Sequence, residues 1–123
     1  MSYRLERLSI PEYTYSVVPQ ATVALVTTKA SALLRQGQPY ISVDISDMEA
    51  EEVRTLLSSL QATDERVYVI WPPEQIGIIL VYHHLIKYYD ELWYPARDDL
   101  WVTDDGFNWL LEISHEEILT FIK

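Results

Sequence analysis

The sequence predicts an α+β or α/β fold, in which about five or six strands form one mixed sheet and three to four helices pack on it. Segments with alternating apolar residues are interleaved with segments whose apolar residues recur at helical spacing. The chain has 123 residues, of which 49% are hydrophobic and 23% charged. These values are typical of a globular protein, so we expect a single domain spanning residues 1–123.

The first third of the chain is predicted to hold three strands and one short helix. Residues 3–10 and 12–18 alternate and are rich in β-branched and aromatic side chains, which indicates two strands separated by a proline. Residues 22–27, TVALVT, predict a third strand. The segment KASALLRQ that follows is predicted to be a helix, with Thr28 as its N-cap and Gly37 at its end.

The middle of the chain predicts a strand, a helix and a second strand. Residues 41–46, ISVDIS, alternate between apolar and polar side chains. Ser46 and Glu49 have the spacing of a capping box, which opens a helix that runs to about Leu60. Residues 66–71, RVYVIW, are apolar on both sides and favour a central strand. This order predicts a parallel pair joined by a right-handed crossover.

The last third is predicted to hold a long helix, a β-hairpin and a short final helix. Pro73 suits the first position of a helix, which then continues until Pro95 forbids it. Two short strands flank the turn signal Asp105–Gly106 and predict a hairpin. Ser114 and Glu117 repeat the capping-box spacing, so the chain is expected to end in a helix.

The charge of the chain is strongly acidic and unevenly distributed. The formal net charge is -10 and the isoelectric point is about 4.5. Residues 1–43 hold four bases and two acids, whereas residues 44–123 hold five bases and seventeen acids. Such a surface repels phosphate groups, so we expect no nucleic-acid binding, and it attracts a basic protein partner. The simpler interpretation is that the acidity serves only solubility.

Cysteine and long apolar stretches are both absent from the sequence. Without cysteine, neither a disulfide framework nor a thiolate metal site is available. The segment MSYRLERLSI lacks the apolar run of a signal peptide, and no stretch is long enough for a membrane span. We therefore expect a soluble, cytoplasmic protein that does not act at a membrane.

Motifs of catalysis and of cofactor binding are also missing. The three glycines form no phosphate-binding loop, and no nucleophile motif is present. His83, His84 and His115, with nearby carboxylates, are the candidates for a metal-dependent enzyme or binder. The HExxH pattern is absent, however, and a helix would place His83 and Asp90 about 10 Å apart along its axis. We predict no cofactor, no metal ligands and no catalytic residues.

The segment YYDELWYPARDDLWVTDDGFNW, residues 88–109, combines seven aromatic residues with six carboxylates. Aromatic rings among acidic groups are typical of a surface that recognises a basic partner. An aromatic core with acids at its solvent edge would have the same composition. The predicted partner-binding residues are Asp90, Glu91, Trp93, Asp98, Asp99, Trp101, Asp104 and Asp105.

The favoured hypothesis is a small acidic interaction protein without enzymatic activity. Its most specific version is an immunity or inhibitor protein that covers a basic toxin or nuclease, because acidic groups can take the place of the phosphates that a basic cleft binds. Two alternatives remain. One is the small metal-dependent enzyme or binder, and the other is a self-associating structural protein. In the latter, Ile76 and Leu80 on the predicted long helix, beside His83 and His84, would form a dimer contact.

Overall fold

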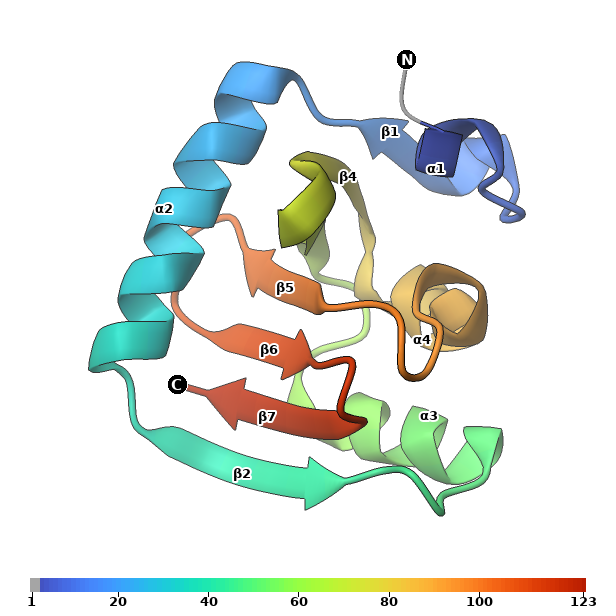
Figure 1. Cartoon of the computed structure of the whole chain (residues 1–123), viewed down its shortest axis with the longest axis vertical. Coiled ribbons are helices and arrows are strands. Elements are labelled where there is room, and N and C mark those ends of the chain that lie inside the picture. The colour runs from blue at the N-terminus through green and yellow to red at the C-terminus, as the bar shows by residue number, and fades with distance from the viewer. Residues whose placement is uncertain (1–2) are drawn as a thin grey trace.

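Seven antiparallel strands form one sheet in the computed structural model, which describes residues 3–123 (Figure 1). The strands lie in the order β1-β4-β3-β5-β6-β7-β2. The α+β class is confirmed, but the sheet is larger than expected and is not mixed. The strands are β1 (Tyr15–Val17), β2 (Pro39–Asp44), β3 (Arg66–Trp71), β4 (Ile76–Val81), β5 (Leu100–Asp104), β6 (Leu110–Ile113) and β7 (Ile118–Ile122). The helices are α1 (Tyr3–Glu6), α2 (Gln20–Gln36), α3 (Ala50–Leu60) and α4 (Tyr82–Leu92), with short 3-10 turns at η1 (Glu12–Thr14) and η2 (Pro72–Glu74).

The sheet is covered on both faces. Along β3, Val67, Val69 and Trp71 join the main core, which contains the buried residues of α3 and α4. Ile70 points to the opposite face, where it packs with Val26 and its neighbours on α2. The central strands are therefore apolar on both sides, as the sequence of β3 predicts.

The predicted strand at residues 22–27 is wrong, because this segment belongs to α2. Val23, Val26 and Ala30 recur at helical spacing and are buried against the sheet. Burial of this stripe outweighs the preference of valine and threonine for strands. Gly37 follows the helix as predicted, and its N–H donates to the carbonyl of Leu33 at 2.7 Å.

The predicted helix from Pro73 to Pro95 is wrong in its first half. Residues 76–81, IGIILV, form β4, and the helix begins only at Tyr82. Strand β4 lies between β1 and β3, so it needs apolar side chains on both faces. A short apolar run of this kind cannot be distinguished from a buried helix by periodicity alone. The η2 turn, followed by Gln75 at φ 55°, reverses the chain between β3 and β4.

The predicted parallel crossover is also wrong. Strand β2 pairs with β7 at the edge of the sheet, whereas β3 pairs with β4 and β5 near its centre. Helix α3 therefore connects β2, at the edge of the sheet, with β3, which is not adjacent to β2. Its N-cap is Glu49, whose N–H donates to Oε1 of Glu52 at 3.0 Å, rather than Ser46.

The predicted hairpin around Asp105–Gly106 is confirmed, because β5 and β6 pair on either side of it. The predicted final helix is wrong, because residues 118–122 form β7. Ser114 and Glu117 instead close the β6–β7 turn, in which the Glu117 N–H donates to the carbonyl of Ser114 at 2.9 Å. Glu117 adopts φ 63°, so the spacing of a capping box here marks a tight turn.

The two strands predicted near the N-terminus are largely absent. Within residues 3–10 the chain forms α1 and an irregular segment. Within residues 12–18 only Tyr15–Val17 forms a strand, paired with β4. No helix within residues 3–123 has the length and apolar character that crossing a membrane requires.

Candidate functional site

The aromatic residues of segment 88–109 are mainly structural. Tyr89, Trp93 and Trp109 are buried, and Tyr94, with 41% of its surface exposed, is the one large exposed ring of this segment. The indole N–H of Trp93 donates to the carbonyl of Asp98 at 2.8 Å. The indole N–H of Trp71 donates to the carbonyl of Leu92 at 2.9 Å, which joins β3 to the end of α4. Most of the aromatic cluster is therefore core, and it positions the loop before β5.

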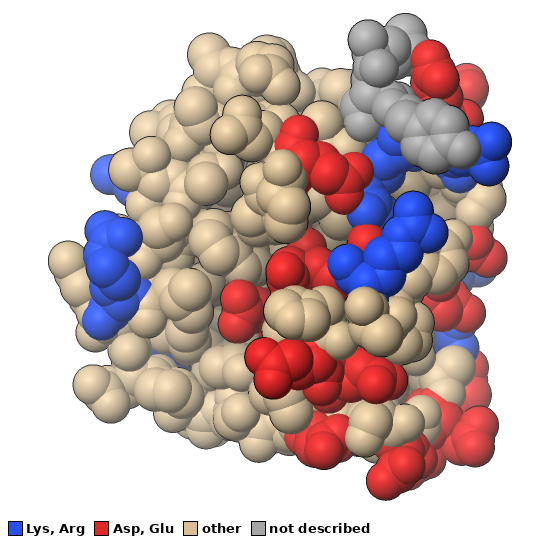
Figure 2. Space-filling view, viewed as in Figure 1, with Lys and Arg blue, Asp and Glu red and all other residues tan. Residues whose placement is uncertain are grey.

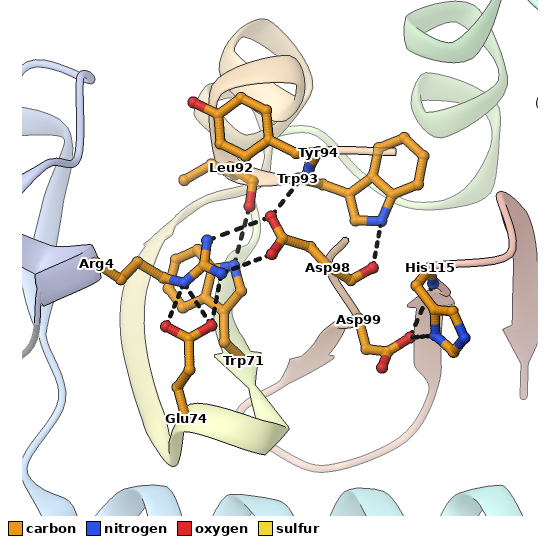
Figure 3. Close-up of polar contacts among 9 residues, drawn as sticks. All are labelled: Arg4, Trp71, Glu74, Leu92, Trp93, Tyr94, Asp98, Asp99 and His115. Atoms are coloured by element: carbon orange, nitrogen blue, oxygen red, sulfur yellow. Dashed lines mark hydrogen bonds and ion pairs between the residues drawn. The ribbon is translucent and has the colours of Figure 1, made fainter. Parts of the chain in front are cut away.

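This loop carries Asp98, a buried carboxylate with a cationic partner (Figure 3). Its Oδ1 accepts a hydrogen bond from Nη2 of Arg4 at 2.6 Å, and its Oδ2 accepts the N–H of Tyr94 at 3.0 Å. The side chain of Asp98 is 2% exposed and that of Arg4 is 13% exposed. Burial acts to lower the pKa of Arg4, but the hydrogen bonds that Arg4 donates to Glu74 and Asp98 outweigh it and raise the pKa. Arg4 is therefore always charged here.

An open groove of about 890 Å³ lies beside this ion pair. Its walls combine cationic, anionic and apolar side chains, which gives it no single charge sign. The lining residues are Arg4, Arg7, Leu8, Glu74, Glu91, Tyr94, Arg97 and Asp98. Arg97 lies over the exposed ring of Tyr94, with its guanidinium carbon 5.9 Å from the ring centroid.

Asp99, the next residue, faces outward and pairs with the β6–β7 turn. Its Oδ1 lies 2.9 Å from Nδ1 of His115 and accepts the backbone N–H of His115 at the same distance. The hydrogen bond to Asp99 raises the pKa of His115. Both side chains are accessible, so this pair belongs to the surface.

A set of carboxylates, here named the acidic rim, lies at the end of the sheet where β2 ends and β5 begins. Its members are Asp44, Asp47, Glu49, Glu51, Glu52, Asp90, Glu91, Asp99, Glu116 and Glu117, of which Asp99 and Glu117 are half-buried and the others exposed. Figure 2 shows acidic side chains gathered on the side of the molecule where α3, α4 and the end of β2 lie, whereas few appear where α2 lies.

Direct contacts join the segments of the acidic rim to one another. Arg54 lies between α3 and α4, with Nη1 at 2.7 Å from Glu51 and Nη2 at 3.2 Å from Asp90. The N–H of Ile45 donates to the carbonyl of Glu117 at 2.9 Å, so the start of the β2–α3 loop is held against the β6–β7 turn. The rim is therefore one surface, built from four separate parts of the chain.

The predicted partner-binding residues do not form a single surface. Asp90 and Glu91 are exposed and Asp99 is half-buried, and these three belong to the acidic rim. The other five lie elsewhere. Trp93, Asp98 and Asp104 are buried, Trp101 is half-buried with its indole N–H donating to Glu112 at 2.8 Å, and Asp105 is exposed at the other end of β5.

That other end of β5 holds a pair of carboxyl groups. Asp104 accepts the N–H and the side-chain amide of Asn108 at 2.7 and 2.8 Å. Burial and the charge of Asp104 raise the pKa of Glu65, and a hydrogen bond from Trp109 partly opposes them. The indole nitrogen of Trp109 meets no partner at strict hydrogen-bond geometry, so this contact is weak and burial dominates.

The histidines do not meet in a metal site. Within residues 3–123, no three side chains of His, Cys, Asp or Glu lie close enough together to hold a metal ion. The rings of His83 and His84 lie close together, with centroids 4.1 Å apart and planes inclined by 35°. Burial, followed by the charge of His83, lowers the pKa of His84. His115 lies in a different part of the molecule, in the β6–β7 turn beside Asp99.

The proposed dimer contact through Ile76 and Leu80 is wrong in its premise. Both residues lie in β4 rather than on a helix, and they are 9% and 3% exposed. They pack in the main core of the same chain. His83 is exposed and His84 is half-buried. Because Ile76 and Leu80 are buried, the two histidines do not share a continuous surface with them.

Sequence reasoning missed the residues that complete this end of the molecule. Arg4 is 70 residues from Glu74 in the chain, and no local pattern connects Arg4 with Glu74 or with nearby Trp71. The acids at the start of α3 did carry a signal, because helical phasing already places Glu49, Glu51 and Glu52 outward. Comparison of the chain with protein-family models, with curated proteins and with solved structures finds no match.

Proposed function

We propose that this protein is a non-enzymatic binding protein whose acidic rim binds a basic protein. The most specific form of the proposal is an inhibitor or immunity protein that covers the basic cleft of a toxin or nuclease. The observation that carries it is the acidic rim, which concentrates carboxylates from four segments at one end of the sheet. Like charges so placed steer a basic partner toward that end and raise the association rate.

The absence of cysteine is compatible with a reducing compartment, so the proposal includes a cytoplasmic location.

The binding surface differs from the one that the sequence alone predicts. Reversing the charge of Asp98 would disrupt a buried ion pair rather than test a surface. The useful positions are exposed members of the rim, such as Asp47 and Glu116.

The test compares two variants of equal net charge. The rim variant carries Asp47→Lys and Glu116→Lys, and the control variant carries Asp64→Lys and Asp105→Lys at the opposite end of the sheet. Each protein is immobilised and exposed to a lysate of the source organism at low and then high salt, and the retained proteins are identified by mass spectrometry.

We expect the native protein and the control variant to retain the same basic protein at low salt and to release it at high salt. The rim variant should retain little of it, and with the purified partner its association rate should be lower and less dependent on salt. Equal behaviour of the two variants would mean that acidity acts only through net charge, and the proposal would then be abandoned.

A further inference from the structure

The guanidinium group of Arg4 is enclosed by two carboxylates and one aromatic ring from elsewhere in the chain (Figure 3). Glu74 accepts hydrogen bonds from Nε at 2.9 and 2.7 Å and from Nη2 at 2.5 Å. Asp98 accepts from Nη2 at 2.6 Å and from Nη1 at 3.3 Å. The guanidinium carbon lies 5.0 Å from the centroid of the Trp71 ring, within the range of a cation–π contact. We name Trp71, Glu74 and Asp98 the guanidinium cage.

The side chains of Trp71 and Asp98, and the backbone of Glu74, are held in place by contacts that do not involve Arg4. Trp71 is fully buried and donates its indole N–H to the carbonyl of Leu92. Asp98 accepts the N–H of Tyr94 on its side chain and the Trp93 indole on its carbonyl. Glu74 belongs to the η2 turn. This turn is closed by the N–H of the next residue, which donates to the carbonyls of Trp71 and Pro72 at 3.1 and 3.2 Å. Two of the three walls, Trp71 and Asp98, are therefore preorganised by the body of the fold, and the third, Glu74, is fixed at its backbone.

The occupant, in contrast, comes from a small peripheral element. Helix α1 has four residues, and Leu5 and Leu8 attach its segment to the main core. Arg4 also lines the open groove of about 890 Å³, so its long side chain has room to turn out of the cage while α1 stays attached. The Glu74 side chain, 39% exposed, forms the accessible wall of the cage.

We propose that the guanidinium cage is a binding site for an arginine side chain of the basic partner, and that Arg4 occupies this site in the free protein. The proposal rests on the proposed function, because it names the group through which a basic partner engages this end of the molecule. The partner's arginine enters through the groove and exchanges with Arg4. Glu91, a member of the acidic rim, also lines the groove, so the site and the rim are continuous.

The chemistry of the cage selects arginine over lysine. Two carboxylates that approach a cation from different edges suit a planar fork of five N–H donors, and the indole face suits a flat delocalised cation. The Asp98 carboxylate is too deeply buried to stay unpaired at low cost. Exchange of one guanidinium for another keeps this carboxylate neutralised, whereas an ammonium group satisfies fewer of its hydrogen bonds.

The experiment empties the cage with Arg4→Ala in the full chain and offers it two peptides. The probes are acetyl-Gly-Arg-Gly-amide and the matched acetyl-Gly-Lys-Gly-amide, and the readout is the thermal unfolding midpoint. We expect the arginine peptide, at tenfold excess over its dissociation constant, to raise the midpoint of the variant by about 5 °C. The lysine peptide should have a clearly smaller effect, and the native protein should not respond at the same concentration because Arg4 fills the cage.

A second variant and a second readout keep the test decisive. Arg4→Ala combined with Asp98→Asn removes the buried charge, so this protein should fold and should not respond to the arginine peptide. If Arg4→Ala alone is unfolded, recovery of its far-ultraviolet circular dichroism by the arginine peptide, but not by the lysine peptide, supports the site equally. Equal effects of the two peptides on Arg4→Ala, or no effect of either, would overturn it.

This test needs neither the partner nor the rim, so the two proposals fail separately. If the guanidinium cage does not bind arginine, the expected difference between the two charge-reversal variants is unchanged. Conversely, a rim that binds no basic protein leaves the peptide response intact. With a partner in hand, Arg4→Ala should bind it more tightly than the native protein, because the internal competitor is gone. Weaker binding would mean that Arg4 has only a structural role.

Discussion

The carboxylates at the two ends of β5 show how differently a buried charge can be accommodated. Asp98, just before the strand, is paired with a guanidinium and a backbone N–H. Asp104, at its last residue, is held by Asn108 and faces the carboxyl of Glu65 instead of a cation. A carboxylate beside a cation is stabilised in its charged form, whereas two neighbouring carboxyl groups oppose each other's ionisation. The stability contributed by the Glu65–Asp104 pair, at the end of β5 that holds Asp104, therefore depends on pH.

We predict that Glu65→Gln stabilises the protein at neutral pH. Burial, followed by the charge of Asp104, raises the pKa of Glu65 above its ordinary value of 4.5. The folded state then binds this proton more tightly than the unfolded state, so the stability due to Glu65 is present at low pH and is lost as the pH rises through the raised pKa. Glutamine imitates the protonated acid and avoids the loss.

Urea denaturation of the native protein and the variant at about pH 7 and about pH 4 measures this effect. The gain in the free energy of unfolding should be present at the higher pH and should disappear at the lower one. A gain of the same size at both pH values would show that Glu65 and Asp104 are not coupled through charge.

At the scale of elements, the contact between α2 and the centre of the sheet depends on a missing side chain. Gly77 stands in β4 opposite Ile70 of β3. A Cβ at Gly77 would lie 2.4 Å from Cδ1 of Ile70, 3.1 Å from the carbonyl oxygen of Val69 and 3.6 Å from Cγ2 of Val23 on α2. The small residue therefore lets the Ile70 side chain and α2 pack closely over the strand.

We accordingly expect Gly77→Ala to lower the free energy of unfolding by about 1–3 kcal/mol through overpacking, although alanine suits a strand at least as well as glycine. Gly106→Ala in the exposed β5–β6 loop is the comparison variant, because its new Cβ would meet Nδ2 of Asn108, which donates to Asp104, and would touch no residue of α2. Guanidinium chloride denaturation of both variants compares the losses. If Gly77→Ala were as stable as the native protein, α2 would pack less tightly on β4 than described.

The whole molecule is electrically polarised. The net charge is -10, and Figure 2 shows acidic side chains gathered on the side that carries α3, α4 and the end of β2. Repulsion among the carboxylates of the acidic rim disfavours the folded state, because unfolding separates them. Salt reduces this repulsion, with a Debye length that shortens from about 30 Å at 0.01 M to about 3 Å at 1 M ionic strength.

The thermal unfolding midpoint of the native protein should therefore rise with sodium chloride concentration. The rim variant, Asp47→Lys with Glu116→Lys, should show a smaller rise than the control variant, Asp64→Lys with Asp105→Lys, although both have the same net charge. Differential scanning calorimetry at low and high salt gives the comparison. The same salt dependence in both variants would indicate that the rim carboxylates do not repel one another more than other acids do.

Several elements and part of the site were predictable because their signals are local. The alternation of ISVDIS, the apolar run of RVYVIW and the Asp105–Gly106 turn each depend on a few neighbouring residues, and the corresponding strands and hairpin are present. The outward phase of Glu49, Glu51 and Glu52 on α3 was local as well. The same local signals misled at IGIILV and at Ser114–Glu117, because an apolar run suits two structures and a capping-box spacing also occurs in turns.

By itself, the sequence determined the α+β class, the acidity of the chain and the hairpin that ends in β6, since composition and short-range pattern suffice for these. Only the tertiary structure decided the all-antiparallel strand order, the burial of the 88–109 aromatics and the enclosure of Arg4 by Glu74 and Asp98. Arg4 and Asp98 are 94 residues apart in the chain. Such a pair forms because burial of apolar faces brings α1 and the β5 loop together, and no periodicity in the sequence records which distant segments will meet.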